Sequence, residues 1–265
     1  KTTDYGKTWT LITNGIPKEE FARVVRADPK RQGLLYAGTE KGMWLSFDDG
    51  ASWSKFQLNL PPVPVADLAI KNDNLIAATH GRSFWMIDDL TPLHQLTKEN
   101  STKDVVLFKP MSSYRMPGGS GWRSANRKLE GENHPGGVMI HYFVKSVDEK
   151  SDVKIEILET SGTVISAYNS KDKGRQQLPV KSGGNRFVWD MRYPGYTTFP
   201  GMIYYDSPNQ GPKAVPAKYK VRLTVNGNSQ EQEFEILKDP RVPSTQEDLQ
   251  AQFDFLVKVR DKVSE

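Results

Sequence analysis

The stretch Ser46-Phe47-Asp48-Asp49-Gly50-Ala51-Ser52-Trp53 decides the expected fold, because its pattern of residue types is already present near the start of the chain. Residues 2–9 read TTDYGKTW, 44 positions earlier, and both copies follow S/T-x-D-x-G-x-S/T-W. Recurrence of one pattern at a spacing of roughly 20 to 50 residues is typical of repeat architectures. The sequence therefore indicates a repeated structural unit more directly than it indicates an activity.

The residue types of this motif predict a tight turn rather than a reactive site. Glycine adopts the positive φ angle that a hairpin between two outer strands needs. Aspartate, serine and threonine side chains hydrogen-bond to backbone N–H groups across such a turn, and tryptophan buries a large ring between neighbouring sheets. We interpret the following residues as a structural clasp, not as a catalytic or calcium-binding loop: Asp4, Gly6, Thr8, Trp9, Asp48, Gly50, Ser52 and Trp53.

Short strand-like segments lie between and after the two motifs. They are rich in β-branched and aromatic residues and are bounded by turn-forming pairs. The first set comprises residues 21–28, 33–40, 43–47 and 52–58, and the second comprises 65–71, 74–79 and 83–88. An ungapped alignment of residues 34–49 with 75–90 places Trp44 on Trp85 and puts Thr91-Pro92 where Gly50-Ala51 would be. Such units predict β-propeller blades, the last of them with a decayed motif.

The two motifs resemble Asp-box repeats, also called bacterial neuraminidase repeats, which occur in sialidases, sortilin-type propellers and exported bacterial proteins described as glycosyl hydrolase-like. The chain is most similar to the last group, whose propeller typically ends in a segment like residues 78–89, ATHGRSFWMIDD. This resemblance covers about the first third of the chain and implies a periplasmic or secreted protein. Two and a fraction blades cannot close a propeller of ~4 to 8 blades, so we expect missing N-terminal blades in the same parent chain.

A second β domain follows residue 100. Residues 104–108 form a short leading strand. The seven strand candidates beyond it are residues 138–145, 153–160, 163–169, 174–180, 185–191, 217–226 and 229–237, and several alternate apolar and polar residues with a period of two. About seven short strands with one buried face predict an immunoglobulin or fibronectin type III-like β-sandwich. Residues 133–137, 187–192, 211–212 and 216–219 are similar to the sandwich that follows the propeller in the same exported family, although Pro216-Ala217 replaces its usual Pro-Gly.

The end of the chain changes to a helical period. Ser244 and Glu247 predict a capping box, and Leu249, Phe253, Leu256 and Val263 would share one helix face. The fold class is therefore all-β, a partial β-propeller followed by an immunoglobulin-like β-sandwich and a C-terminal α-helix. The expected domains are residues 1–100, 101–240 and 241–265.

Two long irregular runs interrupt the second domain. Residues 117–137 form a Gly-rich polar run, which is either a mobile linker or a flap that contacts a ligand through Trp122 and Arg123. Residues 193–216 carry aromatic side chains, which either pack onto their own domain or stack on a sugar or peptide. These aromatic residues are Tyr193, Tyr196, Phe199, Tyr204 and Tyr205.

The sequence holds few candidates for chemistry. The four histidines form no H-x-x-x-H or H-E pair, and no G-x-S-x-G or phosphate loop occurs, so we expect no metal and no cofactor. A glycosidase needs two carboxyl groups ~5 to 9.5 Å apart, and Asp88-Asp89 is either part of such a pair or the relic of a motif. The turn from Thr79 to Arg82 is the one constellation that combines an imidazole, a guanidinium and a glycine. The ligand-binding candidates are His80, Arg82, Trp85, Asp88, Trp122 and Arg123.

The composition limits the classes of partner that we expect for this chain. The 36 basic and 32 acidic side chains are interspersed and give a net charge of +4, which argues against a nucleic-acid surface. Cysteine is absent, and no apolar run approaches the ~18 residues of a membrane helix. We expect non-catalytic recognition or scaffolding with a protein or glycan ligand, without nucleic acid or membrane insertion. The alternative is part of a sialidase-type glycoside hydrolase whose active site the missing blades complete.

Overall fold

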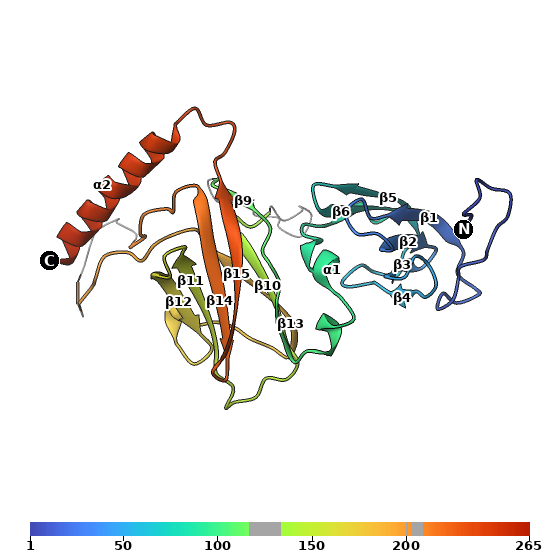
Figure 1. Cartoon of the computed structure of the whole chain (residues 1–265), viewed down its shortest axis with the longest axis horizontal. Helices are drawn as coiled ribbons and strands as arrows, with labels where there is room; N and C mark the ends of the chain where they lie inside the picture. The colour runs from blue at the N-terminus through green and yellow to red at the C-terminus, as the bar shows by residue number, and fades with distance from the viewer. Residues whose placement is uncertain (117–133, 200, 203–208) are drawn as a thin grey trace. The chain divides into compact units, whose positions relative to one another are not determined.

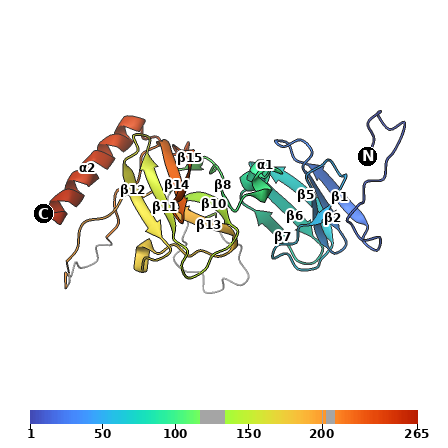
Figure 2. The same cartoon turned by 60° about the horizontal axis from the view of Figure 1, so that its bottom comes forward.

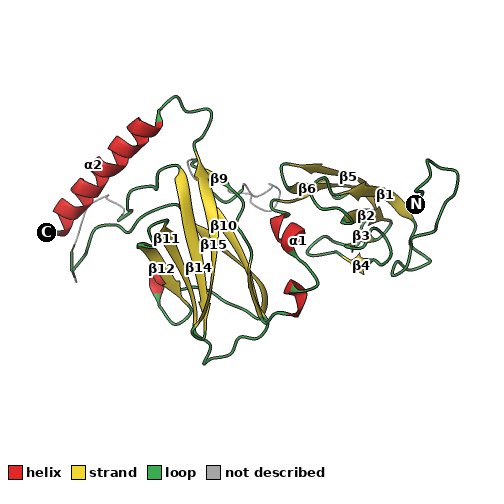
Figure 3. Ribbon diagram, viewed as in Figure 1, coloured by secondary structure: helices red, strands yellow, loops and turns green. Residues whose placement is uncertain are grey.

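The computed structural model describes residues 1–116, 134–199, 201–202 and 209–265 (Figure 1). The chain is mostly β, with several sheets and a C-terminal helix, as the colouring of Figure 3 shows. It divides into two compact units, Lys1–His94 and Gln95–Glu265. Trp122 and Arg123 lie outside the described residues.

The first sheet contains four antiparallel strands in sequence order: β1 (Ala22–Ala27), β2 (Leu35–Thr39), β3 (Gly42–Ser46) and β4 (Ser54–Lys55). The motif at residues 46–53 forms the turn between β3 and β4. The strand predicted at 52–58 is wrong in length, because only Ser54 and Lys55 pair with β3. The chain leaves the sheet beyond them, where Leu58 adopts a φ of 45° and the Gln57 amide donates to the carbonyl of Leu60.

The second sheet contains three antiparallel strands, β5 (Val65–Lys71), β6 (Asn74–Thr79) and β7 (Phe84–Ile87). Figure 2 shows this sheet beside the first one. The two sheets share an apolar core, since alternating side chains of each point toward the other. Its buried members include Leu34, Tyr36, Met43, Leu45, Val65, Leu68, Leu75 and Ala77.

The strand register relates the two sheets as repeats. Ala37 pairs with Trp44 in the first sheet, and Ala77 pairs with Trp85 in the second. Leu35 therefore corresponds to Leu75, so the ungapped alignment, which matched residue 34 to residue 75, is wrong by one position along β2. The cause is the turn between β6 and β7, which holds one residue in excess of its counterpart. A slip of one residue moves every strand side chain to the opposite face, so the correction matters.

The corrected register shows which face of the first sheet corresponds to which face of the second sheet. Leu35, Ala37 and Trp44 cluster with the motif residue Trp53, on the face of the first sheet that turns away from the second sheet. Their counterparts Leu75, Ala77 and Trp85 face the first sheet and help to form the shared core. The opposite face of the first sheet is buried by the second sheet. The equivalent face of the second sheet leaves Phe84 78% exposed and Met86 54% exposed.

The second unit places two sheets around one core. A three-stranded sheet runs in the order β13-β10-β8 and a five-stranded sheet in the order β12-β11-β14-β15-β9. The strands are β8 (Val105–Leu107), β9 (Ser113–Tyr114), β10 (Val138–Val144), β11 (Val153–Glu159), β12 (Val164–Asn169), β13 (Gly183–Trp189), β14 (Ala217–Val225) and β15 (Asn228–Leu237). Trp189 packs edge-on against Tyr219 and Phe234, with ring centroids 5.9 and 6.0 Å away. The strands β12 and β13 are edge strands of their sheets.

Four helical segments complete the described chain, and only the C-terminal one is long. They are α1 (Thr91–Gln95), the 3-10 turns η1 (Asn100–Thr102) and η2 (Gly174–Gln176), and the C-terminal α2 (Gln246–Ser264). The strand predicted at 174–180 is wrong, because η2 occupies its start and only Gln177 makes a single bridge, to Asn169.

Helix α2 begins one residue later than the sequence predicts. Thr245 is the N-cap, and Asp248 completes a capping box with it, so the predicted pair Ser244 and Glu247 is wrong. Leu249 is buried and the Phe253 ring meets Tyr193 edge-on at 4.8 Å. Leu256, predicted on the same apolar face, is exposed. Within the described part of the chain, no helix combines the length and apolar character needed to span a bilayer.

Candidate functional site

The motif turn at residues 46–53 is held by short-range hydrogen bonds that centre on Ser46 and Asp48. The Ser46 hydroxyl donates to Asp48 Oδ1 at 2.8 Å and accepts from the Gly50 N–H at 2.9 Å. The Ser52 N–H donates to Asp48 Oδ1 at 2.8 Å, and its hydroxyl donates to Oδ2 at 2.5 Å. Gly50 has a φ of 89°, and a Cβ atom there would lie 2.6 Å from the Ile12 side chain. The carboxylate is therefore fully engaged inside the turn.

The turn at residues 2–9 repeats the same bonds with the same geometry. Thr2 donates to Asp4 Oδ1 at 2.8 Å and accepts from the Gly6 N–H at 2.8 Å. The Thr8 N–H and hydroxyl donate to Asp4 at 2.9 and 2.7 Å. The agreement shows that the motif specifies this turn by itself, independently of the sheet around it.

These bonds stabilise the ionised form of both aspartates. The Ser52 hydroxyl, followed by the Ser52 N–H and the Ser46 hydroxyl, lowers the pKa of Asp48 to about 2. The backbone N–H and the hydroxyl of Thr8 lower the pKa of Asp4 to about 2 in the same way. A carboxylate that remains ionised and accepts local donors is a poor general acid at neutral pH. The geometry supports a structural role.

The two motif tryptophans differ in their surroundings. Trp53 is 6% exposed, its indole N–H donates to the Ile12 carbonyl at 2.7 Å, and Ile12 and Ile16 pack against it. Trp9 is 74% exposed, so the expectation that both rings are buried between sheets is wrong for the first copy. The described residues place no segment over Trp9 that corresponds to Ile12 and Ile16.

The turn from Thr79 to Arg82 brings only part of the candidate set together. Thr79 bonds through its hydroxyl to the Ser83 carbonyl at 2.6 Å, and the His80 N–H donates to the Pro64 carbonyl at 2.9 Å. The His80 and Arg82 side chains are both exposed. The Trp85 indole N–H donates to the Arg82 carbonyl at 2.9 Å, which ties the turn to β7.

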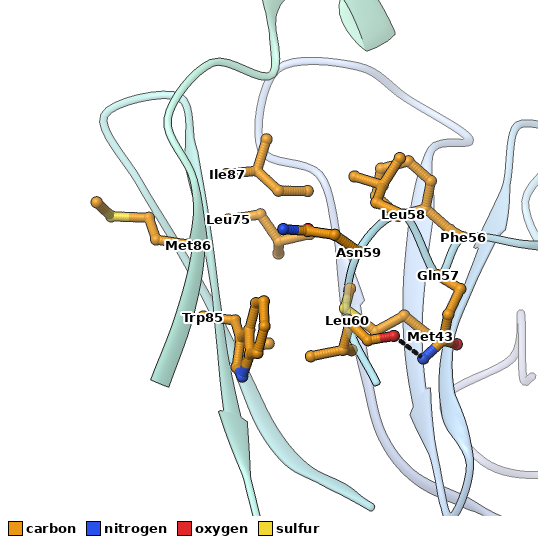
Figure 4. Close-up of a pocket in the computed structure, with 11 residues that line it drawn as sticks. Met43, Phe56, Gln57, Leu58, Asn59, Leu60, Leu75, Trp85, Met86 and Ile87 are labelled. Atoms are coloured by element: carbon orange, nitrogen blue, oxygen red, sulfur yellow. Dashed lines mark hydrogen bonds between the residues drawn. The ribbon is translucent and has the colours of Figure 1, made fainter. Parts of the chain in front are cut away.

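The Trp85 ring also lines a small apolar space between the two sheets of the first unit (Figure 4). The space encloses about 40 Å³ and is lined mainly by aliphatic side chains, with Gln57 and Asn59 as its polar members. Ligand pockets usually offer about 300 to 1,000 Å³. This space therefore has room for little beyond a water molecule or a methyl group, and Trp85 serves here as a core residue.

Asp88 and Asp89 are not held like the motif aspartates. Asp89 is the register counterpart of Asp48, but Ile87 replaces the serine at the start of the motif. Asp89 Oδ1 instead accepts the Thr91 N–H at 2.8 Å and so shapes the entry into α1. This arrangement fits a decayed motif. The structure describes no group of three or more His, Asp or Glu residues that could hold a metal ion in residues 1–116 or the later described ranges.

A buried polar network in the first unit escaped the sequence analysis. Asp28 Oδ2 accepts from the Tyr36 hydroxyl at 2.9 Å and lies 2.9 Å from His94 Nε2, while Oδ1 accepts from the Lys30 and Arg31 N–H groups. Burial alone would raise the pKa of Asp28, but the bonds from His94, the two N–H groups and Tyr36 together lower it. Burial, and then the bond to Asp28, raises the pKa of Tyr36. The network joins β1, β2 and α1, and the sequence offered no spacing signal for it.

A groove in the second unit has the volume of a small-molecule site. It holds about 470 Å³ between the edge strands β12 and β13, and residues 193–195 and 209–211 form its other walls. Tyr168 and Phe187 lie in it with ring centroids 4.6 Å apart. Its charged members are Arg175, Asp190 and Arg192. None of them was among the residues chosen from the sequence.

The aromatic run at 193–216 is only partly described, because Tyr204 and Tyr205 lie outside the described residues. The Tyr193 hydroxyl donates to Glu159 Oε1 at 2.9 Å, and its ring contacts α2. Phe199 is exposed. Tyr193 therefore packs onto its own unit, one of the two roles considered for this run.

No protein-family model and no curated protein matches the sequence. Among solved structures, the extracellular domain of a hybrid two-component system from B. thetaiotaomicron matches with 13% identity and a TM-score of 0.26, over 86% of this chain and 27% of that one. The extracellular domain of a one-component system from the same organism matches with 10% identity and a TM-score of 0.22, over 83% and 25%. The chain thus spans about a quarter of the length of each of these structures. TM-scores this low do not establish a common fold.

Proposed function

We propose that the protein is a non-catalytic recognition or scaffolding part of an exported bacterial Asp-box propeller protein, with a glycan or protein as its ligand. The first unit supplies propeller blades and the second supplies an immunoglobulin-like β-sandwich. The observation that carries this proposal is the pair of motif turns. In each turn, both carboxylate oxygens of the aspartate, Asp4 or Asp48, accept hydrogen bonds from residues of the same turn.

The repeat relation between the two sheets supports the blade assignment. Tyr36 and Leu45, on the first sheet, are buried against the second sheet. Their register counterparts are Ile76 and Met86, and the face that carries them is apolar and open, with Phe84 at its edge. We expect this face to receive a further sheet in the parent protein. Periplasmic or secreted localisation follows from the same family resemblance and is part of the proposal.

A combined binding and turnover screen tests the proposed class. The 265-residue chain is applied to a glycan array and, in parallel, incubated with fluorogenic glycosides, with Asp48→Asn and Asp4→Asn as matched variants. We expect glycan binding without hydrolysis, and equal binding by both variants once each is shown to be folded. Hydrolysis that is abolished by either substitution would contradict the proposal, because it would make a clasp aspartate part of an active site.

A further inference from the structure

We propose that the groove between β12 and β13 binds a carboxylated saccharide, with Arg192 and Arg175 as the residues that contact its anionic groups. This inference rests on the proposed function and names the ligand class for it.

Three half-buried cations, Arg115, Arg192 and Lys213, lie close together, and Arg192 is the one that lines the groove. Arg192 and Lys213 stand directly opposite each other in an isolated antiparallel bridge, which brings their Cβ atoms to roughly 5 Å. Arg115 is close enough to both for their positive charges to repel one another. Like charges placed opposite each other in a β pair are destabilising, so this arrangement needs an explanation beyond stability.

Backbone carbonyls hold the three cations in place, and the described residues place no ion-paired carboxylate on any of them. Arg192 Nη1 donates to the Gly211 carbonyl at 2.9 Å, Arg115 Nε donates to the Ala214 carbonyl at 2.9 Å, and Lys213 Nζ donates to the Met116 carbonyl. Within the described ranges, none of them forms an ion pair with an acidic side chain. The charge of Asp190 acts on Lys213, and its Oδ1 accepts the Arg192 N–H at 3.0 Å.

The pKa values of Lys213 and Arg115 show that the cluster disfavours their charged forms. Burial, followed by the charges of Arg115 and Arg192, lowers the pKa of Lys213. Burial and the charge of Arg192 lower the pKa of Arg115. Half-buried charges of one sign are ordinarily matched by an opposite charge or lost during evolution. A bound anion would supply the missing charge.

The walls of the groove favour a saccharide over a simple anion. The rings of Tyr168 and Phe187 offer apolar surface for the carbon face of a sugar ring, while Gln176 offers a planar polar group suited to hydroxyls. A volume of about 470 Å³ lies within the range of small-molecule sites and exceeds what phosphate or acetate fills.

Calorimetric titration of the whole chain with matched probes tests this inference. Tetragalacturonate and a tetraglutamate peptide with an acetylated N-terminus and an amidated C-terminus each carry four carboxylates, and maltotetraose is the neutral saccharide. We expect tetragalacturonate to bind about tenfold or more tightly than either of the others, and its affinity to fall between about 50 and 300 mM salt because the contacts are partly exposed. Equal or tighter binding of the peptide would assign the groove to acidic peptides and overturn the inference.

Single substitutions locate the site. Arg192→Gln and Arg175→Gln are each expected to weaken tetragalacturonate binding about tenfold or more, since each removes a charge-assisted hydrogen bond. Arg186→Gln, on the same strand as Phe187 but outside the groove, is the matched control and should bind like the wild type. Lys213→Gln should also bind less tightly while its melting temperature rises, because it relieves the repulsion with Arg192. A merely structural Lys213 would lower the melting temperature instead.

The outcomes separate this inference from the function on which it rests. Binding of neutral glycans without a preference for tetragalacturonate would end the inference and leave glycan recognition standing. Tetragalacturonate binding that is unaffected by all three substitutions would place the ligand elsewhere and also overturn the inference. Hydrolysis of tetragalacturonate by the wild type would contradict the non-catalytic function itself.

Discussion

Replacing Trp53 with alanine tests whether the motif acts as a clasp through its tryptophan. The ring is 6% exposed, lies against Ile12 and Ile16, and donates to the Ile12 carbonyl at 2.7 Å. Truncating a buried tryptophan to alanine usually costs about 3 to 5 kcal/mol, through lost burial and the cavity left behind. We expect a loss of this size in the free energy of unfolding of the first unit.

The chain contains its own control at the equivalent position of the other motif copy. Trp9 is 74% exposed, so Trp9→Ala should change the free energy of unfolding by no more than about 0.5 kcal/mol. Trp53→Phe keeps most of the ring but removes the indole N–H, which leaves the Ile12 carbonyl without that donor and should cost about 1 to 3 kcal/mol. The three variants thus separate burial, hydrogen bonding and motif identity.

Urea unfolding with two readouts measures these effects. Far-UV circular dichroism follows the whole chain, whereas hydrogen exchange of the amides in β2 and β3 reports the first unit alone. A cost of about 3 to 5 kcal/mol with a slope of about 1 to 3 kcal/mol per molar urea moves the midpoint by at least about 1 M. Equal midpoints for Trp53→Ala and Trp9→Ala would refute the reasoning, because the two positions would then contribute alike despite their different burial.

Three further predictions follow from bonds described above. Asp48→Asn should destabilise the first unit at neutral pH but not near pH 2. Folding lowers the pKa of Asp48 from 3.8 to about 2, so the carboxylate stabilises the fold above pH 3.8 and this contribution is lost as the pH falls toward 2. Acid unfolding of the wild type and of the variant measures the difference. Tyr36→Phe should cost about 1 to 3 kcal/mol and raise the pKa of Asp28, measurable in carboxyl carbon NMR shifts; an unchanged carboxyl pKa would contradict the bond. Thr245→Ala should cost about 1 kcal/mol in the stability of α2, whereas Ser244→Ala should be neutral by hydrogen exchange, and the reverse order would restore the cap predicted from sequence.

Local features could be predicted from the sequence because their causes lie within a few residues. The bounds of β5 and β6 agree with the predicted segments, since alternating apolar residues and flanking turns define both strands. The motif turns follow equally from eight residues of sequence. Helix α2 was predicted with a cap one residue early, because Ser244 and Thr245 are both good caps with an acidic residue three positions later.

Features that depend on distant residues could not be predicted. The register between the two sheets was off by one because a single inserted residue in the turn after Thr79 is invisible to an ungapped alignment. The cations Arg115, Arg192 and Lys213 lie far apart in the sequence and meet only through the pairing of irregular segments. The exposure of Trp9 depends on what packs over it, which a motif shared with Trp53 cannot reveal.

The hydrogen-bond partners in the motif turn are close in sequence, which bears on the order in which the hairpin and its tryptophan fold. Every hydrogen bond that Asp48 accepts comes from a residue at most four positions away, whereas the Trp53 indole bonds to a carbonyl 41 positions away. Local contacts close small loops and form in microseconds, while distant ones must wait for the chain to collapse. We therefore expect high φ-values at Asp48 and low ones at Trp53: the turn nucleates its hairpin early, and the tryptophan docks after the folding barrier has been crossed.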